Sequence, residues 1–216
     1  MNPPTKAVFT PRKMPSQARA RATVERILNG TRLVLKEKGA EAATTRNIAD
    51  ASGVTTGSIY QYFPHKESIL YELYRQRMAA TVEAFRALLA SDALEQGVDF
   101  FLDRFGHMLW DELEWGRPED IALDKAIGEN PELRLAVADV LDELYHCIVS
   151  MLKYYGCNWT DRRMMELAEY LYSLNHFGFA LRVRQEGDQS DFTRMLTTEL
   201  QTHLIKKAIN EEEPAA

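Results

Sequence analysis

The segment from residue 44 to residue 66, TTRNIADASGVTTGSIYQYFPHK, predicts two short helices joined by a glycine turn. Threonine pairs at 44–45 and 55–56 offer hydroxyl groups that cap the start of each helix. Gly53 suits the left-handed backbone that a tight helix exit needs. A second helix rich in hydrogen-bonding side chains, with about six residues able to enter a major groove, is typical of a DNA-reading helix-turn-helix. We therefore expect this segment to bind DNA.

Apolar residues in the same segment predict how its two helices are held together. Ile48, Val54 and Ile59 supply contacts between them, and Ala49 is small enough to let the two backbones approach closely. The pair is therefore expected to keep one orientation.

With its flanking residues, the segment is similar to the N-terminal domain of the tetracycline-repressor (TetR) family of bacterial transcription regulators. The similarity covers about residues 23–73 and includes, in order, an apolar helix ending at KEKGAEAATT, the helix RNIADASG, the reading helix VTTGSIYQYF and a long helix beginning in HKESIL. It implies an all-α fold of about nine helices. A three-helix helix-turn-helix domain would precede a C-terminal helical domain that binds a ligand and forms a dimer. Gln61 departs from the family, which often has an aromatic residue at this position.

Candidate DNA contacts follow from the resemblance together with the local chemistry. Arg46 is the first candidate for a base edge, because a guanidinium group forms two parallel hydrogen bonds with guanine. The resemblance implies further base-facing positions at Thr56, Gly57 and Gln61, and phosphate contacts at Thr45, Ser58, Tyr60, Tyr62 and Lys66. Packing roles for either tyrosine, and a plain surface charge at Lys66, remain open alternatives.

The charge of the chain is divided along its length. Residues 1–77 contain 13 Lys or Arg against 6 Asp or Glu, a formal charge of +7, whereas residues 78–216 contain 13 against 26, a charge of −13. The basic part is suited to neutralising phosphates, and the acidic part is expected to face away from DNA. A chance division of solvated surface charge is the alternative.

Composition excludes several classes of protein. The chain of 216 residues is long enough for a core without disulfides or metal, and its two cysteines form no CxxC pair, so both are expected to be buried apolar residues. No apolar run approaches the roughly 20 residues of a membrane helix, and no signal peptide is evident. Since the chain also lacks a phosphate-binding glycine loop, GxSxG, HExxH or a Cys/His cluster, we expect a soluble, cytoplasmic protein that is not an enzyme and has no cofactor.

The pattern along the chain predicts four regions. Residues 1–17, with four prolines and three basic residues, are expected to form a flexible basic arm, which either reaches a minor groove or has no role. A DNA-binding domain at 18–66 and a helical regulatory and dimerisation domain at 67–210 follow, and then a disordered acidic tail at 211–216. Beyond the reading helix, the apolar periodicity predicts helices near 66–89, 94–115, 119–128, 131–155, 161–186 and 190–209.

Two apolar stripes on the helix near 161–186 predict a homodimer. One stripe would pack within the subunit, and the other, together with the last helix, would meet a second copy in a four-helix bundle on a two-fold axis. A large monomeric core is the alternative. The interface residues expected are Leu167, Tyr170, Leu174, Phe177, Leu181, Phe192, Leu196 and Leu200.

An excess of aromatic and methionine residues in the acidic part suggests a site for an apolar or aromatic effector, although most of these residues are expected to serve only as core. The candidates are Phe101, Phe105, Met108, Trp110, Tyr145, Tyr172, His176 and Phe179.

Two functions from different classes remain open from the sequence. The first is a ligand-responsive regulator, most simply a repressor, that binds a palindromic operator as a dimer and is released by a small molecule. The second is a DNA-binding regulator without an inducer that acts through a protein partner. A cavity of about 300 Å³ or more would favour the first, and a closed core would favour the second.

Overall fold

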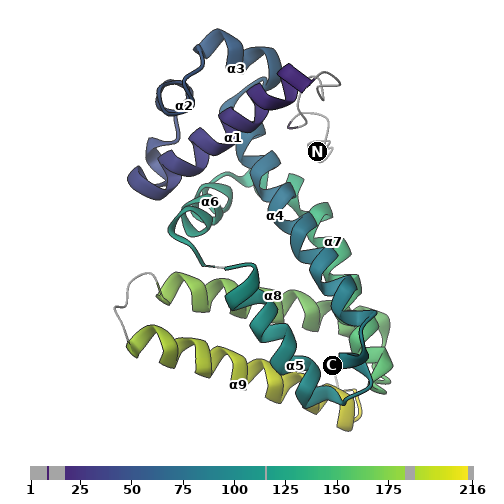
Figure 1. Cartoon of the computed structure of the whole chain (residues 1–216). Coiled ribbons are helices and arrows are strands. Elements are labelled where there is room, and N and C mark those ends of the chain that lie inside the picture. Colours follow the sequence, from purple (N-terminus) through teal and green to yellow (C-terminus); the bar gives the residue numbers. More distant parts are fainter. Residues whose placement is uncertain (1–8, 10–17, 115, 183–187, 214–216) are drawn as a thin grey trace. The chain divides into compact units, whose positions relative to one another are not determined.

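The computed structural model describes residues 9, 18–114, 116–182 and 188–213, without the side chains of residues 179, 180, 182 and 188–191. In this part of the chain the fold is all-α, as predicted, with nine helices and no strand (Figure 1). The helices are α1 (Ala18–Lys38), α2 (Thr45–Ser52), α3 (Thr56–Tyr62), α4 (Lys66–Leu89), α5 (Val98–His107), α6 (Pro118–Glu129), α7 (Pro131–Tyr154), α8 (Asp161–Arg182) and α9 (Asp188–Asn210).

The caps predicted for the two short helices are confirmed. The side chain of Thr44 accepts a hydrogen bond from the backbone N–H of Asn47 at 3.2 Å, and that of Thr55 accepts one from Ser58 at 3.1 Å. Gly53 follows α2 with φ 64° and ψ 30°, the left-handed conformation that glycine adopts without a steric penalty. Local chemistry alone therefore explains where α2 and α3 begin and how the turn between them forms.

The chain divides into two compact units that differ from the single cut predicted at residue 66. Unit 1 comprises residues 1–78 and 117–140, and unit 2 comprises residues 79–116 and 141–216. Helices α4 and α7 contribute to both units. Because residues 117–140 carry three basic and six acidic residues, their inclusion lowers the formal charge of unit 1 from +7 to +4.

Helix α6 belongs to unit 1 because it packs on α1 and is tied to the helices around it. Arg77 of α4 forms ion pairs with Asp120, at 3.4 Å, and with Asp124. Lys125 bonds to Glu41 at 3.2 Å. These contacts join residues more than forty positions apart, which periodicity along the sequence does not reveal.

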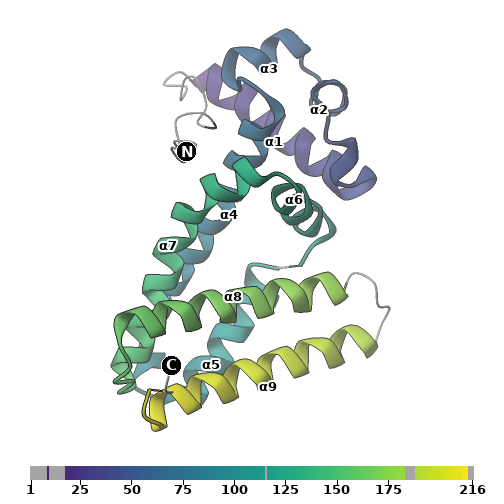
Figure 2. The same ribbon diagram turned by 180° about the vertical axis from the view of Figure 1, so that it is seen from behind.

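Each unit has its own apolar core. In unit 1 the fully buried side chains include Ile27, Leu28, Ile48, Ile59, Phe63 and Ile69. In unit 2 they include Phe85, Phe101 and Leu152, and both free cysteines are buried there, as predicted. Helices α8 and α9 lie side by side in this unit (Figure 2).

The helix expected at 94–115 is shorter and less regular in the structure. It begins as α5 at Val98 and continues into a five-residue π-helical segment, Met108–Glu112. A π-helical turn is widened by one residue, and such turns frequently occur at functional sites. Glu114, at φ 47°, then leads out of the segment.

The two ends of the chain were predicted to be a flexible arm and a disordered tail. Most of the arm lies outside the described residues, but Phe9 is 2% exposed and its ring lies edge-on to that of His65 at 5.4 Å. The structure differs from the prediction for residues 211–213. Glu213 accepts hydrogen bonds from the backbone N–H and hydroxyl of Thr160, at 2.6 and 3.2 Å, and the carbonyl of Glu211 accepts one from Trp159.

None of the helices in the described ranges combines the length and the apolar character that a membrane crossing requires.

Candidate functional site

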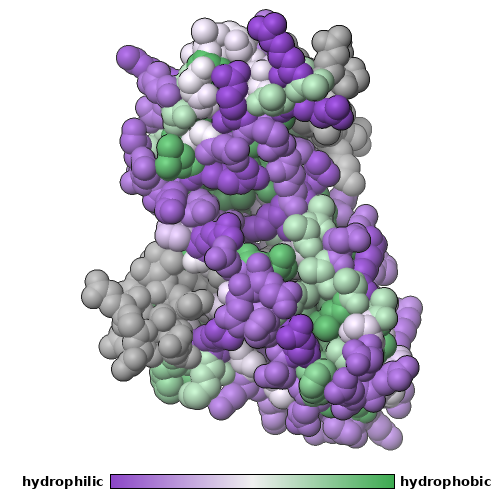
Figure 3. Space-filling view, in the orientation of Figure 1, coloured by the Kyte–Doolittle hydropathy of each residue, from purple (hydrophilic) through white to green (hydrophobic). Residues whose placement is uncertain are grey.

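Helices α2 and α3 of unit 1 form a rigid pair with a polar outer surface. Ile48 and Ile59 are fully buried and Ala49 is 5% exposed, so the two helices share a packed core, as predicted. The hydroxyl groups of Thr45 and Tyr60 lie 3.5 Å apart and join the start of α2 to the middle of α3. On the face of unit 1 shown in Figure 3, hydrophilic residues predominate.

The structure gathers the predicted DNA contacts on α2, α3 and the start of α4 and leaves all of them at least partly accessible. The exposed members are Arg46, Thr56, Gly57, Tyr60 and Gln61, and the half-buried members are Thr45, Ser58, Tyr62 and Lys66. Because Tyr60 is 43% exposed, it is not a core residue. Tyr62, by contrast, is half-buried.

Two positive charges in this set are free to meet an anion. Among the described residues, neither Arg46 nor Lys66 forms an ion pair, whereas Arg75 and Arg77 of the same unit are both paired with carboxylates. Lys66 is the first residue of α4, where the backbone N–H groups of the helix start also favour a negative charge. This arrangement suits phosphate binding.

Gly57 of α3 has no structural need for glycine within the chain. A Cβ atom at this position would meet only the hydroxyl of Thr55, at the ordinary distance of 3.8 Å. Because no side chain projects from α3 at this position, another molecule can approach its backbone closely.

Unit 2 contains a second candidate site, a mainly apolar pocket with a volume of about 50 Å³. Helices α4, α5, α7, α8 and α9 and the π-helical segment all line it. The lining residues are Thr81, Phe85, Leu102, Phe105, Gly106, Leu109, Trp110, Leu144, Ile148, Met151, Leu171, Tyr172, Asn175, Thr198, Gln201, Thr202 and Ile205.

The predicted ligand contacts divide into four groups. Phe105, Trp110 and Tyr172 line the pocket. Phe101 and Met108 are buried outside its lining, while Tyr145 and His176 reach it only through contacts with Tyr172. The side chain of Phe179 lies outside the described residues.

Sequence reasoning missed most of the pocket, including all of its polar groups other than Tyr172. The residues that α9 contributes, Thr198, Gln201, Thr202 and Ile205, are spaced like one face of a helix. That spacing indicates that the four residues share one face of α9. Three of them are polar, however, so a prediction based on aromatic and methionine side chains does not include them.

A larger groove of about 720 Å³ adjoins the pocket and shares Leu102, Gly106, Trp110, Thr198 and Thr202 with it. The groove is more polar, because Asp103, His107, Arg194, Glu199 and His203 also line it. The inner pocket alone is smaller than the 300 Å³ expected for a ligand cavity, whereas a ligand that used both spaces would have enough room.

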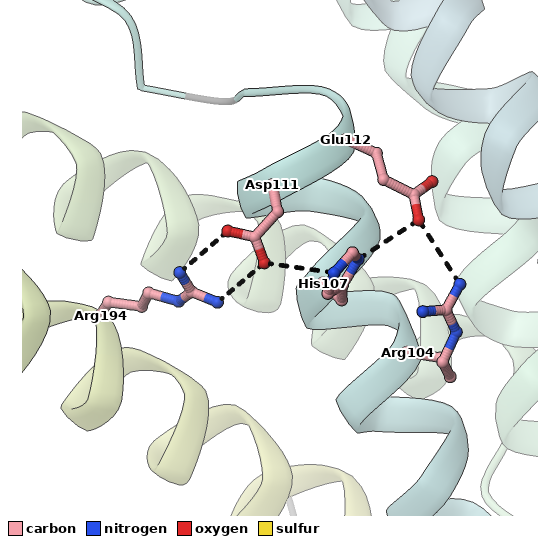
Figure 4. Close-up of polar contacts among 5 residues, drawn as sticks. All are labelled: Arg104, His107, Asp111, Glu112 and Arg194. Atoms are coloured by element: carbon pink, nitrogen blue, oxygen red, sulfur yellow. Dashed lines mark hydrogen bonds and ion pairs between the residues drawn. The ribbon is translucent and has the colours of Figure 1, made fainter.

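A charged network joins the π-helical segment to α9 (Figure 4). Arg194 donates two hydrogen bonds to Asp111, both at 3.3 Å, and lies 5.5 Å from the centre of the Trp110 ring. The network continues through His107, which is 3.2 Å from Glu112. Arg194 thus contacts both Asp111 and Trp110, and Trp110 lines the pocket as well as the groove.

The geometry of unit 1 defines the class of protein: an all-α chain with a capped helix-turn-helix whose reading helix is exposed. Residues 27–73 match the family model described as bacterial regulatory proteins, tetR family. The segment that contains the helix-turn-helix is therefore similar to the regulatory proteins of this family.

Individual relatives are similar over different lengths. The chain is 40% identical over 55 residues to the HTH-type transcriptional repressor KstR2 of Rhodococcus jostii (strain RHA1), a match that spans 26% of this chain and 27% of the relative. A TetR-family transcriptional regulator from Syntrophomonas wolfei str. Goettingen superposes with a TM-score of 0.67 at 17% identity, covering 88% of this chain and 96% of that one. A transcriptional regulator from Saccharomonospora viridis in complex with choline gives 0.60 at 22% identity, covering 87% and 97%. At such identities the two structures establish a common fold.

Proposed function

We propose that the chain is a transcription repressor that binds a palindromic operator as a dimer and releases it when a small molecule occupies unit 2. The observation that carries the DNA-binding part is the helix-turn-helix itself. Its two helices are capped and share a buried core, while Arg46, Thr56 and Gln61 remain exposed on its surface. The repressor named among the relatives supports the direction of regulation.

The exposed surface of α8 and α9 supports the dimer. Five of the eight interface residues predicted from the sequence are exposed large apolar side chains: Tyr170 at 52%, Phe177 at 64%, Phe192 at 57%, Leu196 at 47% and Leu200 at 43%. The opposite stripe of α8 is buried within unit 2, at Ala168, Leu171 and Tyr172. Exposed apolar side chains on two helices that pack together are expected to bind a partner, and a second copy supplies the same surface.

A dimer also accounts for specificity. One reading helix contacts only a few base pairs, which is too few to select a site among many competing sequences. Two copies on a two-fold axis read two half-sites of a palindrome, about one helical turn or more apart.

The pocket and groove of unit 2 support control by a small molecule. The likeness to a regulator that holds choline supports such a use of this fold. Helices α4 and α7 each contribute residues to both units, so a ligand that prefers one arrangement of these helices would change the affinity for DNA. A regulator controlled only by a protein partner is the alternative, and no specific observation favours it.

The test is selection of duplex fragments from genomic DNA by the purified protein at physiological ionic strength, followed by footprinting of the selected fragments. We expect protected palindromes with half-sites one helical turn or more apart. Failure to prefer any duplex over random competitor would refute the proposal. Fragments with a single protected half-site would refute the dimer but not DNA binding.

A further inference from the structure

We propose that the effector is a mainly apolar molecule with an uncharged end that donates a hydrogen bond, from an O–H or N–H group, to Oδ1 of Asn175. This inference rests on the proposed function, because it specifies the chemistry of the ligand that the pocket of unit 2 would take.

Asn175 of α8 is the anchor in this proposal. It is 7% exposed and lines the pocket, and its side-chain oxygen is buried without a hydrogen-bond partner in the described structure. Buried polar atoms in folded proteins nearly always have a partner, so an acceptor left open at a pocket wall indicates a donor that comes from elsewhere.

Two other polar groups of the pocket are already engaged. The side-chain amide of Gln201 donates to the carbonyl of Leu171 at 2.9 Å. The hydroxyl of Tyr172 is hydrogen-bonded to the ring of His176. Asn175 differs from these two neighbours because its acceptor oxygen is buried without a partner in the described structure.

The lining of the inner pocket argues against an ionised group next to Asn175. No Asp, Glu, Lys, Arg or His is among the described residues that line the pocket, whose wall is largely made of residues such as Phe85, Phe105 and Trp110. An ionised group there would lose its hydration without gaining a counter-charge. In the adjoining groove, Arg194 is already paired with Asp111 (Figure 4).

The size of the two spaces indicates how the ligand would lie. With about 50 Å³, the inner pocket accommodates only the donor end of a ligand next to Asn175. Trp110 and Gly106 line both spaces. The apolar body would therefore extend past these two residues from the pocket into the groove of about 720 Å³. The Trp110 ring, which lines both spaces, would pack against that body.

The test compares three probes that differ in one property each. Benzyl alcohol and anisole are isomers with the same heavy atoms, but only the alcohol donates a hydrogen bond, and benzoate carries a negative charge on the same ring. Dissociation constants for the full chain are measured by ligand-observed NMR titration. We expect the alcohol to bind about 2- to 10-fold more tightly than the ether, and benzoate to bind most weakly.

Variants then assign the preference to Asn175. Asn175→Leu keeps a similar volume and removes the acceptor, so the preference for the alcohol should disappear. Gln201→Leu is the matched control and should keep it. If Asn175→Leu fails to fold, the comparison of the two isomers on the unaltered protein still decides the question.

Several outcomes would overturn the inference: equal affinity for the isomers, tighter binding of benzoate, no binding of any probe, or a preference that survives Asn175→Leu. Operator affinity measured with each probe separates this inference from the proposed function. A preference for the alcohol without any change in operator affinity would refute control by the ligand and leave its chemistry intact. Equal binding of the two isomers, together with weaker operator binding in their presence, would refute the proposed chemistry and leave control by the ligand intact.

Discussion

Gly30 of α1 lies directly against Ser52, the last residue of α2. A Cβ atom added at Gly30 would come within 2.7 Å of the Cβ of Ser52 and 2.8 Å of its backbone nitrogen, which is closer than real Cβ contacts. The hydroxyl of Ser52 donates to the carbonyl of Ile48 at 2.6 Å. The close approach of these backbones sets how α1 supports the helix-turn-helix, and a methyl group has no space between them.

Gly30→Ala is therefore expected to destabilise the protein by about 1 to 3 kcal/mol, because backbone rather than a flexible side chain must move. The measurement is the free energy of unfolding in urea. Gly128→Ala in α6, where an added Cβ meets nothing within 4 Å, is the matched control and should be neutral or stabilising by up to about 1 kcal/mol. Equal effects of the two changes would contradict this account of the packing.

Arg46→Ala should weaken binding to the selected operator by about 1 to 3 kcal/mol while leaving non-specific binding nearly unchanged. The reason is that a guanidinium group hydrogen-bonded to a base edge distinguishes one base pair from another. Fluorescence anisotropy with operator and scrambled duplexes measures both affinities. Arg162→Ala in α8 removes an exposed arginine from unit 2 and serves as the control. A comparable loss on both duplexes would assign Arg46 to a phosphate instead.

Lys66→Ala should weaken binding to every duplex to a similar extent and reduce the slope of log affinity against log salt by about one, because a phosphate contact releases a counterion. The slope comes from titrations at several salt concentrations. Lys207→Ala in α9 is the control for loss of a positive charge. An unaltered slope in Lys66→Ala would count against the phosphate contact.

Phe177→Asp should convert the dimer to monomers and abolish operator binding, because it places a charge in the apolar surface of α8. Phe177 is 64% exposed in the single chain, so the change should leave the fold of the subunit intact. Sedimentation velocity reports the oligomeric state. Leu135→Asp in α7 alters a side chain of similar exposure, 58%, outside the predicted interface and should remain dimeric. A dimeric Phe177→Asp variant would disprove this interface.

Asp120 is expected to make stability depend on pH. Burial raises the pKa of its carboxyl group above the ordinary value of 3.8, and the nearby Arg77 opposes this shift without cancelling it. The folded state therefore holds the proton to a higher pH than the unfolded chain does. Consequently the contribution of Asp120 to the free energy of unfolding falls as pH rises through the folded-state pKa.

Asp120→Asn removes that titration. Its free energy of unfolding relative to the unaltered protein should rise as pH increases upward from about 4, in urea titrations at several pH values. The same change at the exposed Asp50 is the control. Parallel pH profiles for Asp120→Asn and the unaltered protein would show that the burial of this carboxylate has no energetic effect.

Local chemistry made the helix-turn-helix of unit 1 predictable. The caps at Thr44 and Thr55, the left-handed Gly53 and the buried pair Ile48 and Ile59 involve residues close together in the sequence, so hydroxyl groups, glycine and apolar spacing were sufficient to place them. The same reasoning located most of the helices, because proline and glycine mark their ends.

Tertiary contacts decided the place of α6 and the lining of the pocket, which the spacing of residues in the sequence does not reveal. Helix α6 joins unit 1 through Arg77 and its partners, and the pocket draws its walls from five helices, so aromatic content identified only Phe105, Trp110 and Tyr172 among its lining. Whether Asn175 has a hydrogen-bond partner depends on which side chains converge around it. The sequence by itself therefore determined the local elements and the charge of residues 1–77. The tertiary structure alone decided which groups surround each buried polar atom, because those groups come from residues distant along the chain.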